Sequence, residues 1–273
     1  DIKNGKSGFT VHGQGLRGLK RPAHPLNAGE SGATMRLMAG LLAGQAFNSD
    51  LAGKGSLLNR PIDRVARPLS AMGAVISSSG GRAPLRIRGS RLTGANHKLS
   101  IPSAQVKSAI LLAGLYAEGP TSITERLATR DHTERLLKYL GARISSSGLN
   151  LYLRPGRFNA KDIKVPGDIS SAAPFIVAAC LLPGFKLTIS GVGLNPGRTG
   201  LIRALKAMGA RITVKPAAAA PEPEGEITVR GSNLIGVRIR PDEVPSMIDE
   251  LPLLALAASL ARGVTVISGI GEL

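Results

Sequence analysis

Three segments of this chain repeat one another at a spacing of 68 residues, and this repeat constrains the fold more than any other feature. They cover residues 68–76, 136–144 and 204–212. Each reads as the last turn of an amphipathic helix, then a glycine suited to a left-handed helix end, then the start of a strand. The chain is therefore expected to fold as a series of similar α/β units.

A second series of segments alternates with the first. Each begins with a serine that can cap a helix and continues into an Ala/Leu-rich run, at residues 31–44, 103–114, 170–183 and 246–263. After the last three runs come short β-branched strands, at residues 120–123, 185–189 and 264–267. One period then holds two helices and several strands, in the order βαββαβ.

The Ala/Leu-rich helices are apolar on nearly every side, which is typical of buried helices. We therefore expect an α/β fold whose βαββαβ repeats turn their helices inward and their sheets outward, so that the units close around a common axis. An open, doubly wound α/β sheet is the alternative. Gly13, Gly15 and Gly18 match the spacing of a dinucleotide-binding loop. Pro22 and Pro25 follow where a helix would have to begin, so this match carries little weight.

Two domains are expected. Residues 164–168 read as a break between structural elements, so we place a first domain at residues 1–165 and a partial second domain at residues 166–273. The Pro/Ala-rich stretch 216–224 reads as a surface loop. The sequence begins without Met, and we expect a chain that is cut short at both ends, with both domains incomplete.

The formal net charge of +17 favours anionic partners: nucleic acid, an anionic membrane surface, or small phosphorylated and carboxylated substrates. The basic residues are scattered and aromatic residues make up only 3%, which is not the pattern of nucleic-acid binding. No apolar stretch reaches the length of a membrane span. Small anionic substrates are therefore favoured, without nucleic acid or membrane as partner. The lone Cys180 lies in an apolar run and is interpreted as a core residue.

Polar side chains gather at the predicted helix starts, in five motifs at residues 29–36, 58–62, 102–108, 128–134 and 244–252. Free N–H groups and the helix dipole attract anions to such positions. In the first three motifs, Arg36 and Arg60 are suited to gripping a phosphate or carboxylate, and Ser103, Gln105 and Lys107 to contacting a ligand. The plain alternatives are capped helix starts and solvated surface arginines.

The last two motifs combine cations with carboxylates. Thr129 and Arg130 are better ligand candidates than His132, which we interpret as a residue that caps or orients a helix start. Asp249 and Glu250 precede an apolar helix. A partly desolvated carboxylate there can act as a base, or it can complement the helix dipole.

Together these motifs resemble the enolpyruvylshikimate-phosphate synthases, an enolpyruvyl transferase family, in order over nearly the whole chain. The matching stretches are residues 31–36, 60–62 with 72–74, 103–109, 129–134, 165–172, 191–196 and 248–252. The resemblance implies two domains, each of three βαββαβ units with inward-facing helices (an inverse α/β barrel). It implies transfer of the enolpyruvyl group of phosphoenolpyruvate to the 5-hydroxyl of shikimate 3-phosphate, with release of phosphate. No metal or organic cofactor is implied.

The resemblance also implies roles for single residues. Asp249 matches the position that removes the hydroxyl proton. The positions that hold shikimate 3-phosphate match Ser103, Ala104, Gln105, Thr129, Arg130 and Asp249. Those that contact phosphoenolpyruvate match Gly32, Arg60 and Gln105. Glu30 stands where many family members have Asn, so its carboxylate is expected to turn away or to find a partner.

The segment that carries the family's N-terminal Lys-Ser motif, and the Lys-Glu-Ser-Asp-Arg segment expected just after Leu273, are expected to be missing from this sequence. We therefore expect negligible turnover from this chain alone. The resemblance further implies a cytoplasmic monomer whose partners are its two small-molecule substrates.

Two alternatives stay open. A UDP-N-acetylglucosamine enolpyruvyl transferase shares fold and chemistry but carries a reactive Cys in a glycine-containing loop, whereas Cys180 lies in a predicted helix. A non-catalytic anion- or RNA-binding repeat protein would bind polynucleotides with a strong salt dependence and would not prefer shikimate 3-phosphate.

Overall fold

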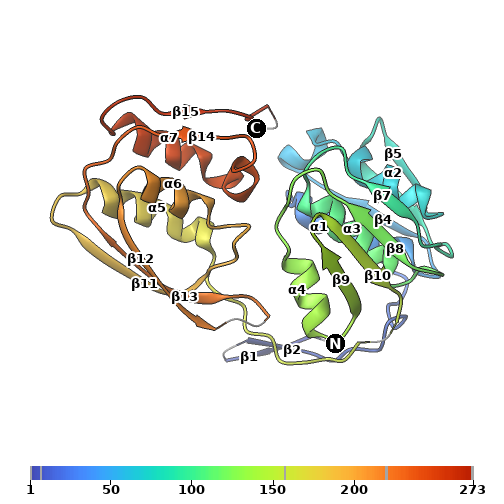
Figure 1. Cartoon of the computed structure of the whole chain (residues 1–273). Helices are drawn as coiled ribbons and strands as arrows, with labels where there is room; N and C mark the ends of the chain where they lie inside the picture. Colours follow the sequence, from blue (N-terminus) through green and yellow to red (C-terminus); the bar gives the residue numbers. More distant parts are fainter. Residues whose placement is uncertain (1, 7, 157, 219–220, 272–273) are drawn as a thin grey trace. The chain divides into compact units, whose positions relative to one another are not determined.

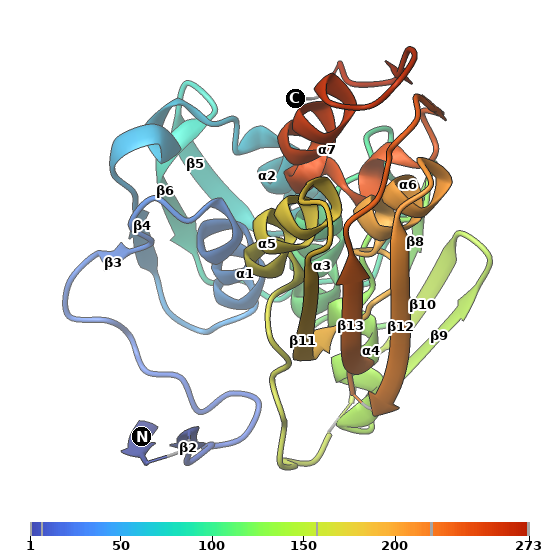
Figure 2. The ribbon, with the colours of Figure 1, turned by 90° about the vertical axis from the view of Figure 1, so that its left-hand side faces the viewer.

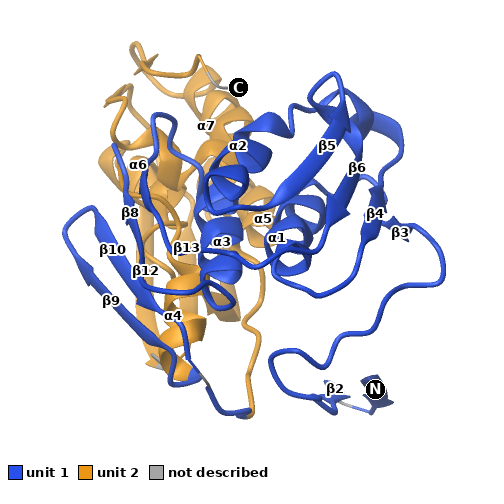
Figure 3. Cartoon of the chain, turned by 90° about the vertical axis from the view of Figure 1, so that its right-hand side faces the viewer, with its two compact units in different colours: residues 1–126, 140–161 blue, residues 127–139, 162–273 orange. Residues whose placement is uncertain are grey.

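The structure is a computed structural model that describes residues 2–6, 8–156, 158–218 and 221–271. Its contacts divide the chain into two compact units (Figure 3). Unit 1 holds Asp1–Arg126 and Leu140–Lys161, and unit 2 holds Leu127–Tyr139 and Asp162–Leu273. The domain boundary placed between residues 165 and 166 stays a prediction.

The first part of unit 1 is a hairpin followed by a four-stranded sheet with two helices (Figure 1). The hairpin is β1 (Ile2–Gly5) and β2 (Gly8–Val11). The sheet region runs β3 (Leu26–Asn27), α1 (Gly32–Ala43), β4 (Ser49–Ala52), the 3₁₀ helix η1 (Gly55–Asn59), α2 (Asp63–Ala71), β5 (Val75–Ser79) and β6 (Arg82–Arg88). The strand order is β3-β4-β6-β5, with β3 and β4 parallel and the other pairs antiparallel.

The second part of unit 1 repeats this topology. It contains β7 (Asn96–Lys98), α3 (Ala104–Gly114), β8 (Thr121–Thr124), β9 (Arg143–Ser147) and β10 (Asn150–Arg154). The strand order is β7-β8-β10-β9, again with one parallel pair followed by antiparallel pairs. The helix α4 (His132–Tyr139), which follows β8 in the chain, belongs to unit 2.

Unit 2 contains a third repeat and the beginning of another. The repeat runs α5 (Ile169–Leu181), β11 (Lys186–Gly193), α6 (Gly200–Ala207), β12 (Arg211–Ala218) and β13 (Glu224–Arg230), with the strand order β11-β13-β12. Helices α5 and α6 cover one face of this sheet (Figure 2). Then come β14 (Arg238–Ile239), η2 (Val244–Ser246), η3 (Ile248–Glu250), α7 (Leu251–Ser259) and β15 (Val266–Ile267).

The predicted α/β repeat is confirmed, but the elements of the first two repeats run βαβαββ, and those of the third αβαββ, rather than βαββαβ. In each repeat a single strand separates the two helices. The strand after each helix-ending glycine pairs with the next strand of the chain in an antiparallel hairpin. These hairpins are β5–β6, β9–β10 and β12–β13. Both strands of the hairpin therefore follow the second helix.

The repeated glycines adopt the predicted left-handed conformation. The φ angles of Gly73, Gly141 and Gly209 are 94°, 91° and 91°. At Gly73, the amide N–H donates to Ser70 O at 2.9 Å, and the next amide donates to Leu69 O at 3.0 Å. These two bonds satisfy carbonyls that the end of α2 would leave open. A side chain would be strained at this φ, which explains why glycine recurs.

Two of the four predicted serine caps are confirmed. Ser31 caps α1 and Ser103 caps α3. The cap of α5 is Asp168 rather than Ser170, because its carboxylate accepts from the amides of Ser170 at 3.2 Å and Ser171 at 3.1 Å. The helix predicted from Ser246 begins instead at Leu251, where a proline in the first turn suits a helix start. Ser246 lies in η2.

Inward-facing helices are confirmed in unit 1, where α1 packs against α3. A Cβ on Gly40 would overlap the carbonyl oxygen of Ala109, so the two helix backbones are in direct contact. In unit 2, α5 and α7 bury one face and leave Phe175 and Leu256 exposed. None of the helices that the structure describes is long and apolar enough to cross a membrane.

Cys180 is a core residue, as predicted. Its side chain is fully buried in α5. Burial raises the pKa of its thiol to about 11. Because the thiolate is the nucleophilic form of cysteine, this thiol is unreactive at neutral pH.

Candidate functional site

A cluster of cationic and polar groups gathers in unit 1 around the start of α1. Gly32 is the buried first residue of this helix, and Arg36 lies one turn further on. The Nη1 of Arg36 donates to Oε1 of Gln105 at the start of α3, and Nη2 donates to Pro61 O at 3.3 Å. Arg36 thereby joins three segments that are distant in sequence.

Two guanidinium groups face Gly32. A Cβ built on Gly32 would lie 3.1 Å from Nη1 of Arg36 and 3.4 Å from Nη1 of Arg60. Burial, followed by the nearby charges of Arg60 and Arg64, lowers the pKa of Arg36. The electrostatic repulsion between these like charges falls when an anion binds among them. The cluster is therefore suited to a phosphate or carboxylate.

The start of α3 brings three more predicted site residues to unit 1. The Oγ of Ser103 accepts from the amide of Val106 at 3.4 Å, and Ala104 and Gln105 are the first two residues of the helix. Lys107, which sequence reasoning treated as a ligand candidate, is instead fully buried and bonded to Glu125 at 3.0 Å. A buried lysine is tolerated in this apolar helix because the Glu125 carboxylate, in the same unit, pairs with its charge.

Glu30 does have a partner. The Oγ of Ser56 donates to Oε2 of Glu30 at 3.4 Å, and the Glu30 carboxylate packs against Gly55. Both residues belong to η1. The Glu30 carboxylate is thus held by η1.

Replacing Gly32 with alanine is expected to weaken the binding of inorganic phosphate about tenfold, or by about 1.4 kcal/mol. The methyl group would occupy space in front of Arg36 and Arg60 and push their guanidinium groups back. The helix itself should tolerate alanine. Calorimetric titration of phosphate measures the effect. Gly13→Ala is the matched control, since a Cβ there meets no atom within 4 Å. Unchanged affinity in Gly32→Ala would contradict the expected geometry.

Unit 2 brings Arg130 and Asp249 together across 119 residues of sequence. The Nη2 of Arg130 lies 2.5 Å from Oδ2 of Asp249. Arg130 and Thr129 precede α4 and are half-buried, and Asp249 lies in η3 with its side chain half exposed. The candidate base is therefore accessible and already paired with a cation.

Arg198 is a second cation beside Asp249, and sequence reasoning missed it. Its Nη1 lies 3.7 Å from Oδ2 of Asp249, and its Nη2 lies 3.8 Å from Oε1 of the buried Glu250. Nη2 also contacts Oδ1 of Asp168 at 3.3 Å and donates to Oγ of Ser170. The available signal was an arginine two residues before the first residue of α6. Nothing in the sequence showed that it faces η3.

His132 is the first residue of α4, and its Nδ1 lies 2.9 Å from Oε1 of Glu222. Asp131 accepts from Nε of Arg135 at 2.8 Å and from Nδ2 of Asn195 at 2.8 Å. Burial raises the pKa of Asp131, but these hydrogen bonds outweigh it and the pKa lies below its usual value. The contacts hold the start of α4, which agrees with the interpretation of His132 as a helix-start residue.

The predicted site residues thus form two groups, one in each unit. Unit 1 holds Gly32, Arg60, Ser103, Ala104 and Gln105, and unit 2 holds Thr129, Arg130 and Asp249. That the two groups serve one site stays a prediction. Across the described ranges, no group of three or more His, Cys, Asp or Glu residues is placed to hold a metal ion.

Comparison with solved structures identifies the class of fold. The enolpyruvyl transferase NikO from Streptomyces tendae superimposes with a TM-score of 0.68 at 19% identity, over 86% of this chain and 56% of that one. An EPSP synthase from Acinetobacter baumannii superimposes with a TM-score of 0.87 at 46% identity, over 100% of this chain and 63% of that one. The fold is that of the enolpyruvyl transferases.

Sequence comparison narrows the class to one family. The family profile of EPSP synthase (3-phosphoshikimate 1-carboxyvinyltransferase) matches residues 1–273. The enzymes of that name from Acidithiobacillus ferrooxidans and Geotalea uraniireducens are 50% and 49% identical to this chain, over 98% and 100% of its length. The chain belongs to the EPSP synthase family. It spans 62% and 64% of the length of these two relatives.

Proposed function

We propose that this chain carries substrate-binding and catalytic residues of a 3-phosphoshikimate 1-carboxyvinyltransferase. That enzyme transfers the enolpyruvyl group of phosphoenolpyruvate to the 5-hydroxyl of shikimate 3-phosphate and releases phosphate. The observation that carries the proposal is the convergence of Arg36 and Arg60 at Gly32, with Gln105 bonded to Arg36, because these residues match the family's motifs and are suited to binding an anion. The identity of the two substrates is proposed from membership of the EPSP synthase family.

In this proposal the cluster at Gly32 binds phosphoenolpyruvate. Guanidinium groups offer paired N–H donors that suit phosphate and carboxylate oxygens. The cations offset the substrate's negative charge and hold it in place, so both binding and orientation contribute. No metal or organic cofactor takes part in this proposal.

Shikimate 3-phosphate is assigned to Ser103, Ala104, Gln105, Thr129, Arg130 and Asp249. Asp249 is the proposed base that takes the proton of the attacking hydroxyl. Its pairing with Arg130 supports this role, because Oδ2 is held in one place while half of the side chain stays open to a ligand. We further propose a monomer that acts in the cytoplasm.

Replacing Arg130 with glutamine is expected to weaken the binding of shikimate 3-phosphate by about ten- to a hundredfold, the effect of losing a charge-assisted hydrogen bond. Binding rather than turnover is the measurement, by calorimetry on this chain. Arg126→Gln is the control, since it removes the same charge from an exposed position nearby.

The same assay tests the alternatives. Tighter binding of UDP-N-acetylglucosamine than of shikimate 3-phosphate would overturn the proposed acceptor. Salt-dependent binding of a polynucleotide, with no preference for shikimate 3-phosphate, would indicate an anion-binding repeat protein instead. The buried thiol of Cys180 already sets this chain apart from transferases that use a reactive loop cysteine.

A further inference from the structure

The first sheet of unit 1 carries arginines on the face that points away from its helices. Along β6, Leu85 and Ile87 are buried in the core, whereas Arg86 and Arg88 are exposed. Side chains alternate across a strand, so these two arginines stand on the outer face. Helix α1 packs on the other face, through its contacts with β4 and β6. The outer face is therefore distinct from the cluster at Gly32.

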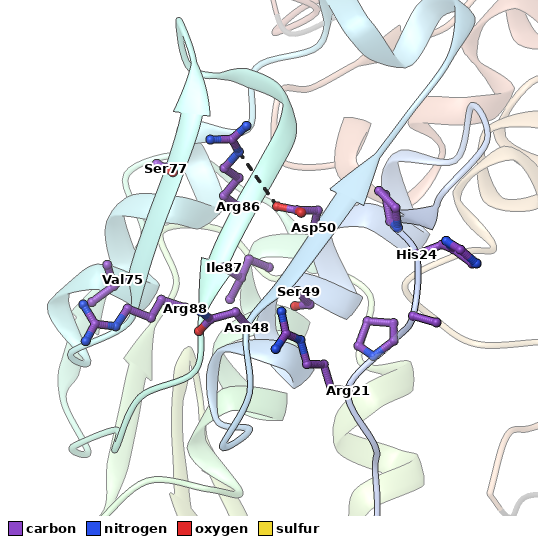
Figure 4. A pocket seen from close by; sticks show the side chains of 13 residues that line it. Arg21, His24, Asn48, Ser49, Asp50, Val75, Ser77, Arg86, Ile87 and Arg88 are labelled. Atoms are coloured by element: carbon purple, nitrogen blue, oxygen red, sulfur yellow. Dashed lines mark ion pairs between the residues drawn. The ribbon is translucent and has the colours of Figure 1, made fainter.

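A hollow of ≈ 440 Å³ lies on this outer face (Figure 4). One wall is the segment 21–25, and the others are β4, β5 and β6. Its polar lining includes Arg21, His24, Asn48, Asp50, Arg86 and Arg88. Small-molecule sites in proteins measure roughly 300–1,000 Å³, so the hollow has room for a small metabolite.

The charges around the hollow do not balance. Asp50 pairs with Arg86 at 3.9 Å and offsets one of the three arginines. Arg21 and Arg88 form no ion pair with any residue that the structure describes. Figure 4 shows these two side chains on either side of Asn48, whose amide can add an uncharged donor. Two uncompensated guanidinium groups beside one concave surface favour an anion.

We propose that this hollow is a second anion site that binds the phosphoryl group of a small phosphorylated molecule through Arg21 and Arg88. The planar donor fork of each guanidinium suits phosphate oxygens. Val75, half exposed on the same wall, offers an apolar surface for the carbon skeleton of the ligand. None of these residues belongs to the candidate functional site, so the inference does not rest on the proposed function.

Pyrophosphate is the probe, titrated by calorimetry at constant ionic strength into Arg60→Gln protein, in which the cluster at Gly32 is weakened. In that background, the double change Arg21→Gln and Arg88→Gln is expected to weaken pyrophosphate binding about a hundredfold, tenfold for each lost charge-assisted contact. Both side chains are exposed, so the melting temperature should stay unchanged.

The matched control is the double change Arg82→Gln and Arg91→Gln. It removes two exposed charges from the same unit, outside the hollow. If the control weakens binding as much as the test variant, diffuse surface charge explains the affinity and the site is refuted. If pyrophosphate binds the test variant as tightly as the Arg60→Gln parent, or binds neither, the site is refuted as well.

Discussion

Replacing Lys107 with methionine is expected to lower the free energy of unfolding of unit 1 by about 3–5 kcal/mol. The Nζ of Lys107 lies 3.0 Å from Oε2 of Glu125, and their side chains are 1% and 7% exposed. The methionine would fill the space of the lysine stem but leave the Glu125 carboxylate buried without its cation. An uncompensated buried charge is among the most destabilising single changes in proteins.

The measurement should resolve the two units, because they need not unfold together. Native-state hydrogen exchange does so: the amides of α3 should exchange faster in Lys107→Met, and those of α5 should not. Lys98→Met, at an exposed position of β7, is the control. The double variant Lys107→Met and Glu125→Leu should recover most of the loss, since it removes both charges. A double variant as unstable as Lys107→Met would show that the lost charge pair is not the cause.

The local features of the fold were predictable from the sequence because each has a local cause. Glycine at the end of α2 or α6 is required by a positive φ, and serine at the start of α1 or α3 by an open amide. Such requirements act within a few residues, so they can be recognised from the residue type at one position of the sequence. The same reasoning was wrong at Ser246, because Pro252 in the first turn favours a helix that begins at Leu251, five residues after Ser246.

The candidate site was predictable only as a set of residue types at helix starts. Arg36 and Gln105 are 69 residues apart, and Arg130 and Asp249 are 119 apart, so their pairing depends on how the repeats pack. Lys107 shows the limit of such reasoning. A lysine at the start of an apolar helix is compatible with a ligand or with a buried partner, and only the position of Glu125 decides between them.

Replacing Arg198 with methionine is expected to lower the free energy of unfolding of unit 2, also by about 3–5 kcal/mol. The side chain of Arg198 is 15% exposed and lies within 4 Å of carboxylates of Asp168, Asp249 and Glu250. The Glu250 side chain is only 3% exposed and keeps Ser170 as a hydrogen-bond donor. Without the guanidinium, one buried and two partly exposed carboxylates would repel one another across the start of α5 and η3.

Arg203→Met is the matched control, because among the described residues the Arg203 guanidinium donates only to neutral oxygens: Pro196 O at 3.1 Å, Thr199 Oγ1 at 3.0 Å and Ser246 Oγ at 2.8 Å. Its loss should cost less, about 1.5 kcal/mol, the lower end of the range for hydrogen bonds to a charged group, because these bonds are exposed to solvent. Adding Glu250→Gln to Arg198→Met should restore part of the stability, and hydrogen exchange should place both effects in α5 and α7. Equal losses for Arg198→Met and Arg203→Met would show that charge is not the cause. If charge is the cause, Arg198 also holds Asp249 in position, and Arg198→Met should weaken the proposed binding of shikimate 3-phosphate even where the protein stays folded.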